Sequence, residues 1–265
     1  ASSVGTIIAT FSTSDPESSS ISYSLSGTDS GKFAIASDGT VTLASALDYE
    51  IKSGYNITVN ASDGTNTTSQ ALTVTATNVN EAPTLSSTLA ASSFPEASSV
   101  GTIIATFSTS DPESSSISYS LSGTDSGKFS IASDGTLTLA NSLDYEIKQA
   151  YSVTVNASDG THTASQGLSI SATNVNEAPT LSSTLVASSF PESSVVGTTI
   201  ATSSASDSEA SSISYSLSGT DSSKFSIASN GTVTIGSLLD YETKQAYSVT
   251  VNASDGTYTT SQSLT

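Results

Sequence analysis

A repeat of 96 residues constrains the fold of this chain more than any other feature of its sequence. The segment VGTIIAT begins at Val4 and again at Val100, and the close copy VGTTIAT begins at Val196. The segments LDYE and NASDGT recur at the same interval, with no insertion between copies. Self-similarity at a fixed period is the signature of a tandem array in which each copy forms one structural unit. The chain is therefore expected to contain three such units.

Each copy has the sequence pattern of an all-β domain. Apolar residues alternate with polar ones in short rows such as Ile7, Ala9 and Phe11, while Ser, Thr, Gly and Asn fill the gaps between rows. An Asp-Gly or Asn-Gly pair, which tolerates the positive φ angles of a tight turn, separates two rows in every copy and predicts a β-hairpin there. These pairs are Asp38-Gly39, Asp134-Gly135 and Asn230-Gly231.

Six or seven short strands in each copy suit a Greek-key sandwich of two sheets. We therefore expect an all-β chain of three tandem Greek-key β-sandwich domains of the immunoglobulin-like kind, arranged as an elongated array. The expected domains are residues 1–79, 80–175 and 176–265, of which the first is truncated at its N-terminal side and the third at its C-terminal side.

The balance of charge points to metal ions as partners. The chain has 24 acidic and 6 basic residues, for a formal charge of −18. Such a surface repels the phosphates of nucleic acids and of anionic lipids, and it attracts cations. The sequence has no cysteine, which excludes disulfides and thiolate zinc sites and leaves bound divalent ions as a cross-link. It also has no apolar stretch of the roughly 20 residues that span a membrane, and Ala1 does not open a signal peptide, so we expect any export signal or anchor to lie outside this segment.

The acidic residues fall into five short motifs that recur with the repeat. Carboxylates, Asn side chains and backbone carbonyls are the oxygen ligands that calcium prefers, whereas magnesium demands a stricter octahedron, and zinc and copper favour His or Cys. The motifs are DPE (Asp15 and Glu17, Asp111 and Glu113, with DSE at Asp207 and Glu209), LDYE (Asp48 and Glu50, Asp144 and Glu146, Asp240 and Glu242), SDG (Asp63, Asp159, Asp255), NVNEAP (Asn78, Asn80 and Glu81, Asn174, Asn176 and Glu177) and FPE (Glu96, Glu192).

Taken in this order and three times over, the five motifs resemble the cadherin repeat, in the version found in large secreted bacterial adhesins. The resemblance covers the whole chain and implies that calcium ions bind between successive repeats. Two departures stand out. Asn78 and Asn174 occupy linker positions where the family usually has Asp, and the first junction has no FPE glutamate in this chain. We therefore expect the first junction to be the less complete of the two.

The resemblance implies a ligand set for each junction. The first set is Asp48, Glu50, Asn78, Asn80, Glu81, Asp111, Glu113 and Asp159. The second set is Glu96, Asp144, Glu146, Asn174, Asn176, Glu177, Asp207, Glu209 and Asp255. Asp15, Glu17, Asp63, Glu192, Asp240 and Glu242 are interpreted as half-sites that face further repeats.

These features predict a calcium-rigidified extracellular stalk or adhesion segment, secreted or at a cell surface, that neither binds nucleic acid nor enters a membrane. The alternatives are a ligand-binding or homophilic adhesion module, or a structural subunit of a surface filament. An enzyme is not expected, because His162 is the only histidine and is interpreted as an exposed loop residue. The pair Asp48 and Glu50 imitates a glycosidase pair, but its recurrence at the ends of domains favours metal binding. Solvated surface charge is the remaining interpretation of the acidic residues.

Overall fold

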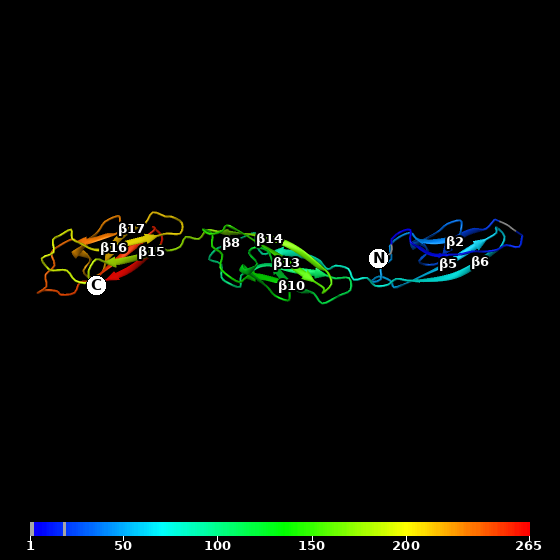
Figure 1. The fold of residues 1–265 in the computed structure, drawn as a ribbon, viewed down its shortest axis with the longest axis horizontal. Helices are drawn as coiled ribbons and strands as arrows, with labels where there is room; N and C mark the ends of the chain where they lie inside the picture. The colour runs from blue at the N-terminus through cyan, green and yellow to red at the C-terminus, as the bar shows by residue number, and fades with distance from the viewer. Residues whose placement is uncertain (1–2, 18–19) are drawn as a thin grey trace.

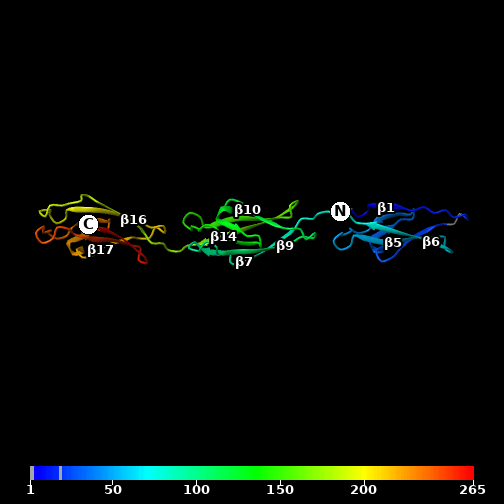
Figure 2. The same cartoon turned by 90° about the horizontal axis from the view of Figure 1, so that it is seen from below.

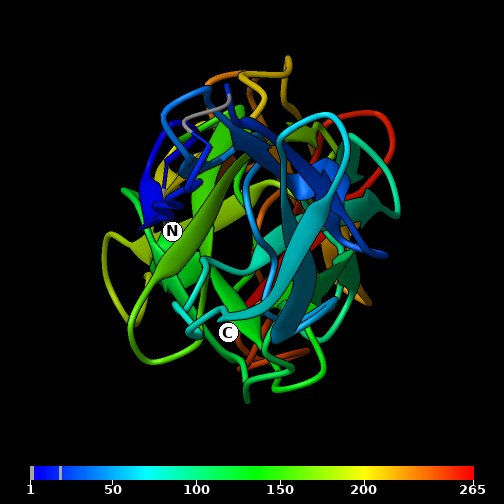
Figure 3. The same cartoon turned by 90° about the vertical axis from the view of Figure 1, so that its right-hand side faces the viewer.

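The computed structural model describes residues 3–17 and 20–265 and arranges them as three β-sandwiches in a row (Figure 1, Figure 2). Seen along the row, the three sandwiches lie over one another (Figure 3). Apart from strands, the regular elements of the described residues are three short 3-10 turns, η1 (Ser30–Lys32), η2 (Ser126–Lys128) and η3 (Ser222–Lys224). None of these is long or apolar enough to cross a membrane. The predicted all-β tandem architecture is confirmed, while the predicted limits 1–79, 80–175 and 176–265 stay a prediction.

The central sandwich shows the fold of one repeat most fully. One sheet has the strand order β10-β13-β14-β8 and the other has the order β11-β12-β9-β7. All neighbours are antiparallel except β8, which runs parallel to β14. The strands are β7 (Thr84–Leu89), β8 (Ser93–Pro95), β9 (Ile103–Ser110), β10 (Ser118–Ser122), β11 (Phe129–Ile131), β12 (Thr136–Leu139), β13 (Ala150–Ser158) and β14 (Thr163–Thr173).

The outer sandwiches repeat this plan with fewer strands among the described residues. The first has sheets β1-β4-β3 and β2-β5-β6, and the third has sheets β15-β16-β19-β18 and β17-β20-β21. Their strands are β1 (Ile7–Thr10), β2 (Ser22–Ser26), β3 (Phe33–Ile35), β4 (Thr40–Leu43), β5 (Gly54–Ser62), β6 (Thr67–Thr75), β15 (Thr180–Leu185), β16 (Thr199–Ser206), β17 (Ser214–Ser218), β18 (Phe225–Ile227), β19 (Thr232–Ile235), β20 (Val249–Ser254) and β21 (Thr259–Leu264).

The core of each sandwich follows the period-2 pattern of the sequence. In the second repeat Leu137 and Leu139 of β12 face Val153 and Val155 of β13, and all four side chains are buried. Alternate residues on these strands point to solvent, which places each strand with one face in the core. The burial of one apolar face per sheet fixes the register of the strands and therefore the positions of the loops at the two poles.

The predicted hairpin is confirmed in all three repeats. β3 pairs with β4, β11 with β12, and β18 with β19, each across the Asp-Gly or Asn-Gly turn. Gly135 has a φ of +84°, a conformation that L side chains rarely adopt. A Cβ atom at this position would also collide with the Phe107 carbonyl oxygen. The turn thus depends on glycine both for its backbone angle and for the close approach of β9.

The predicted inward row Ile7, Ala9 and Phe11 is wrong at its first residue. Ile7 is 65% exposed, and its counterpart Ile103 is 50% exposed. The register shifts between Ile7 and Ala9 where β1 pairs with β4, which marks a β-bulge. A bulge inserts one extra residue and reverses the side-chain alternation locally. Consequently two adjacent residues, Ile104 and Ala105, are buried in the second repeat.

Replacing Gly135 with alanine should destabilise the second sandwich by about 2 kcal/mol or more, because the side chain needs an unfavourable φ and meets backbone that cannot move away. Gly127→Ala is the matched control, since no described atom lies within 4 Å of a Cβ there and its φ is not in the left-handed region. The measurement is denaturant unfolding of the full chain, in which Gly127→Ala should stay within about 0.5 kcal/mol. Equal stability of the two variants would contradict this account of the turn.

Candidate metal centres at the two junctions

The acidic motifs lie at the two poles of the sandwiches. The LDYE turns connect β4 to β5 and β12 to β13 at the pole that precedes a linker. The DPE or DSE loops after β9 and β16 and the SDG turns after β13 and β20 lie at the opposite pole, which follows a linker. In the row of sandwiches these two poles face each other across the NVNEAP segment (Figure 1). Sheet topology therefore brings four motifs together at each junction.

At the first junction three glutamates converge from three separate parts of the chain. Glu50 belongs to the first sandwich, Glu81 to the linker and Glu113 to the second sandwich, and one carboxylate oxygen from each lies within 4.8 Å of the others. The Glu81 N–H donates to Glu113 Oε2 at 3.4 Å. Like charges at this spacing repel one another unless a cation or a proton intervenes. The juxtaposition expected from the sequence is therefore present between the poles and the linker.

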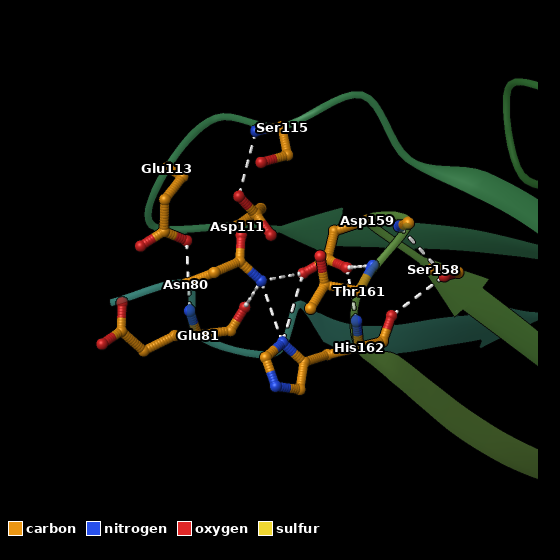
Figure 4. A network of polar contacts seen from close by, with 10 residues as sticks. Asn80, Glu81, Asp111, Glu113, Ser115, Ser158, Asp159, Thr161 and His162 are labelled. Carbon is orange, nitrogen blue, oxygen red and sulfur yellow. Dashed lines mark hydrogen bonds and ion pairs between the residues drawn. The ribbon is translucent and has the colours of Figure 1, made fainter. Parts of the chain in front are cut away.

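Asn80 of the linker is bound to the SDG turn of the second sandwich (Figure 4). Its side-chain Nδ2 donates to Asp159 Oδ2 at 2.7 Å. Asp159 Oδ1 accepts the N–H groups of His162 and Thr161, both at 2.6 Å. These hydrogen bonds, led by the one from His162, lower the pKa of Asp159 to about 2. Asp159 is thus held ionised beside the linker.

His162 also lies at this junction. Its side chain is 45% exposed, and Nδ1 is 2.9 Å from Asn80 Nδ2 and 3.8 Å from Asp159 Oδ2. The interpretation of His162 as a loop residue is correct in that it follows a turn, but it missed these contacts. The signal in the sequence was its place three residues after the SDG aspartate, where the other repeats have Asn66 and Tyr258.

The second junction carries a denser set of carboxylates. Glu146, Glu177 and Glu209 each place an oxygen within 4.8 Å of the others, and Glu146 belongs to a second triad with Glu96 and Asp144. Asn176 Nδ2 donates to Asp255 Oδ2 at 2.7 Å, and Asn174 Nδ2 donates to Glu146 Oε1 at 3.1 Å. The junction thus reproduces the glutamate triad and the Asn–Asp hydrogen bond of the first one and adds further residues. The added members are Glu96, Asp144 and Asn174.

Glu96 is a buried and ordered member of the second junction. It is only 5% exposed, and its carboxylate accepts the N–H groups of Tyr145 at 2.6 Å and Val175 at 2.7 Å. It therefore ties the LDYE turn to the start of the linker.

Crowding shifts the proton affinity of the clustered glutamates. The close approach of the Glu209 carboxylate, together with burial and the charges of Glu96, Glu209 and Glu146, raises the pKa of Glu177 to about 7. At the first junction, the corresponding contact with Glu113 raises the pKa of Glu81. Partial loss of hydration raises the pKa of Glu146, with a smaller contribution from the charge of Glu96. At these three positions the ionised form of the carboxylate is destabilised relative to the protonated form.

Several oxygens at the junctions are buried without a hydrogen-bond donor. Among the residues that the structure describes, these are Asp111 Oδ2, Glu113 Oε1, Asp207 Oδ2 and both carboxylate oxygens of Glu209. An anionic oxygen that is removed from water and has no donor is stabilised only by a proton or a cation. Both junctions are lined mainly by oxygen donors, the set that suits a hard cation such as calcium. The residues present therefore fit that ion.

Two predicted ligands of the first junction, Asp48 and Asn78, are less closely involved than the others. Asp48 is exposed, and its Oδ1 accepts the Ile51 N–H at 2.9 Å, so that oxygen closes the turn. Asn78 lies exposed in the linker, without the contact that its counterpart Asn174 makes. Of the residues interpreted as half-sites, Glu192, Asp240 and Glu242 form a triad of their own within 4.8 Å. Asp15 and Glu17 belong to the loop between β1 and β2 and Asp63 to the turn between β5 and β6, and these connections lie at the outer end of the first sandwich (Figure 1).

Comparison with known proteins gives one family. The cadherin domain matches residues 1–80, 91–176 and 187–265. The chain is 34% identical to human protocadherin Fat 4 over 242 residues, which are 84% of this chain and 5% of that protein. It is 31% identical to cadherin-4 of Caenorhabditis elegans over 238 residues, which are 83% of this chain and 6% of that protein. It thus spans only a small part of the curated relatives it matches.

Solved structures show the same fold. Extracellular repeats 22–24 of mouse cadherin-23 align with a TM-score of 0.58 and 24% identity, covering 98% of this chain and 90% of that one. Extracellular cadherin domains 1–5 of protocadherin gamma B2 align with a TM-score of 0.59 and 26% identity, covering 92% of this chain and 52% of that one. Both are rows of the same kind of β-sandwich.

The raised pKa of Glu177 predicts a pH dependence in the presence of a chelator. Because the folded value of about 7 exceeds the ordinary value of 4.5, the folded chain binds more protons than the unfolded chain between these pH values. The free energy of unfolding should therefore fall as the pH rises from about 4.5 to about 7. Thermal unfolding at a series of pH values measures this slope.

Glu177→Gln should flatten that slope, since the amide has no proton to lose. Glu192→Gln is the control, because Glu192 is an exposed glutamate at the far end of the third sandwich. An unchanged slope in Glu177→Gln would contradict the assignment of the crowded junction as its cause.

Proposed function

Because this chain belongs to the cadherin family and consists of three tandem cadherin domains, we propose that it is a calcium-rigidified segment of an extracellular stalk or adhesion protein. Calcium ions would bind at the two junctions and join the neighbouring sandwiches through the linkers. The observation that carries this proposal is the convergence of Glu50, Glu81 and Glu113, one from each of the three parts of a junction.

The proposed mechanism converts ion binding into stiffness. Without a cation, repulsion between the converging carboxylates favours arrangements in which the two sandwiches separate or bend. A divalent ion that bridges the poles and the linker binds the straight arrangement best, so binding shifts the population toward it and adds stability. The work of this segment is mechanical, and it includes no catalytic step.

The proposed ligands are the residues that the sequence assigns to each junction. For the first junction they are Asp48, Glu50, Asn78, Asn80, Glu81, Asp111, Glu113 and Asp159. For the second they are Glu96, Asp144, Glu146, Asn174, Asn176, Glu177, Asp207, Glu209 and Asp255. The orphan oxygens of Asp111, Glu113, Asp207 and Glu209 support their inclusion.

The setting and the partner are also proposals. We place the segment outside the cell, as part of a secreted or surface protein, which fits the family and the absence of cysteine from the sequence. The relatives named above are animal proteins, so the bacterial adhesin type is supported only by the resemblance of the motifs. The near-identity of the three copies favours a spacer, and a homophilic or ligand-binding adhesion module is the second candidate because adhesion is the work of the family.

Chelation should make the chain shorter on average and more variable in shape. Small-angle X-ray scattering of the full chain, with calcium and with a chelator, measures this change. Glu209→Gln, which removes a glutamate of the second junction, should reduce the effect of calcium on the maximum dimension. Glu17→Gln is the matched control, because Glu17 occupies the same motif position at the end of the first sandwich that faces away from both junctions. Identical profiles with calcium and with chelator would refute the proposal.

The two junctions should differ in calcium affinity. The second has the bond between Asn174 and Glu146, which has no counterpart at Asn78, so its ligands are better ordered. We expect at least about a tenfold difference in dissociation constant, about 1.4 kcal/mol. Calorimetric titration should show two classes of site, of which Glu209→Gln removes the tighter and Glu113→Gln the weaker. A single class that both variants weaken equally would contradict this order.

A further inference from the structure

Three of the six basic residues form the same ion pair, one in each repeat. Lys52, Lys148 and Lys244 follow the LDYE glutamate by two residues, and each contacts an aspartate 23 residues earlier in the chain. The partners are Asp29, Asp125 and Asp221, with Nζ to Oδ1 distances of 2.6, 2.6 and 2.5 Å. The aspartate side chains are only 10–11% exposed, whereas the lysines are 38–41% exposed. Neither residue of any of these pairs belongs to the five acidic motifs.

The aspartate of each pair is fixed to the body of the sandwich. Asp125 stands directly before η2, and its Oδ2 accepts the Ser152 N–H from β13 at 2.7 Å. Lys148 Nζ contacts both of its oxygens, at 2.6 and 2.7 Å. The ion pair with Lys148, followed by the Ser152 hydrogen bond, lowers the pKa of Asp125. Asp125 is therefore an ionised, ordered anchor point on the sheet.

The lysine of each pair closes the LDYE turn. The Lys148 N–H donates to the Asp144 carbonyl oxygen at 2.9 Å, which joins the two ends of the turn. At the other end, the Tyr151 hydroxyl accepts the Asp144 N–H and donates to the Asp144 carbonyl oxygen, both at 2.9 Å. Lys148 Nζ also lies 5.6 Å from the centroid of the Tyr151 ring. The turn is thus clamped to the core at its first and last residues.

Between these two clamps only Tyr145 packs against the apolar core. Ile147 is 83% exposed, and its counterpart Ile51 is also 83% exposed. Glu146 itself is exposed. Because burial of Ile147 does not order the segment, the position of Glu146 depends on the packing of Tyr145, on hydrogen bonds and on the ion pair at Lys148.

We propose that the Lys148–Asp125 pair is a positioning device that holds Glu146 in place for ion binding at the second junction, and that Lys52–Asp29 does the same for Glu50 at the first. This inference rests on the proposed function. Neither partner touches the ion, and both act by keeping the turn in its binding geometry before the ion arrives. Outer-shell partners of metal ligands commonly change metal affinity by 10- to 100-fold when they are removed.

The third repeat provides an internal control. The Lys244–Asp221 pair has the same geometry, and its turn carries the triad of Glu192, Asp240 and Glu242 beyond the third sandwich. Loss of this pair should weaken its own sandwich as much as loss of the Lys148 pair weakens the second. It should leave calcium binding at both junctions unchanged.

The test is calorimetric calcium titration of the full chain as Lys148→Met, Lys148→Arg and Lys244→Met variants, with thermal unfolding of each. Lys148→Met should weaken the tighter class of sites about tenfold, leave the weaker class unchanged and lower the melting temperature. Lys148→Arg keeps the charge and should restore most of the affinity. Lys244→Met should lower the melting temperature but leave the calcium isotherm unchanged.

Two negative outcomes are distinguishable. If the unmodified chain binds calcium and Lys148→Met gives the same isotherm, the positioning role is overturned while the proposed function stands. If the unmodified chain takes up no calcium, the proposed function is overturned and this inference with it. Should Lys148→Met unfold the second sandwich, the Asp125→Asn/Lys148→Met double variant removes the unpaired buried charge and still lacks the clamp, so its isotherm decides the question.

Discussion

The arrangement of the three sandwiches depends on the electrostatic repulsion between carboxylates that the fold brings together. Sheet topology fixes the LDYE turn at one pole of a sandwich and the DPE loop at the other, so a row of sandwiches places glutamates of different domains within 4.8 Å. The linker adds a further glutamate to each group. These charges cannot all be accommodated as free anions in a partly dry site, as the pKa of about 7 at Glu177 indicates. A proton or a cation between these carboxylates relieves the repulsion.

The interior of each sandwich is stabilised by contacts that do not involve the carboxylates of the junctions. Its core is apolar, its hairpins depend on glycine, and its buried aspartate is neutralised by a lysine of the same domain. The charge that remains uncompensated lies at the poles. Such a division lets each domain fold on local and intradomain contacts, while the geometry between domains responds to the ionic composition of the solvent. In the proposed calcium-bound state, the same carboxylates that destabilise the free junction become the contacts that hold it.

Much of the fold was predictable from the sequence because it follows from short-range sequence patterns. The repeat, the strands and the hairpins follow from periodicity and from turn dipeptides such as Asp134-Gly135. The pole of the sandwich at which each acidic motif lies follows from the two strands that its loop connects. The bulge at Ile7 was not predictable, because the alternation Ile7, Ala9 and Phe11 is equally regular in either register and cross-strand pairing decides between them. The pairing of Lys148 with Asp125 spans 23 residues, and only tertiary structure brings such partners into contact.

The two junctions show how an array of nearly identical repeats acquires local differences. Sandwich cores tolerate few changes, since their strands and turns are fixed by packing and by backbone angles. The poles are different, because a single residue there changes the contacts of a junction without altering either domain. His162 contacts Asn80 at the first junction, while Tyr258 occupies the same position in the third repeat. Asn174 donates to Glu146 at the second junction, whereas its counterpart Asn78 lies exposed without this contact at the first. Under the proposed function, stiffness along such a chain would be set junction by junction, by pole residues that differ between repeats.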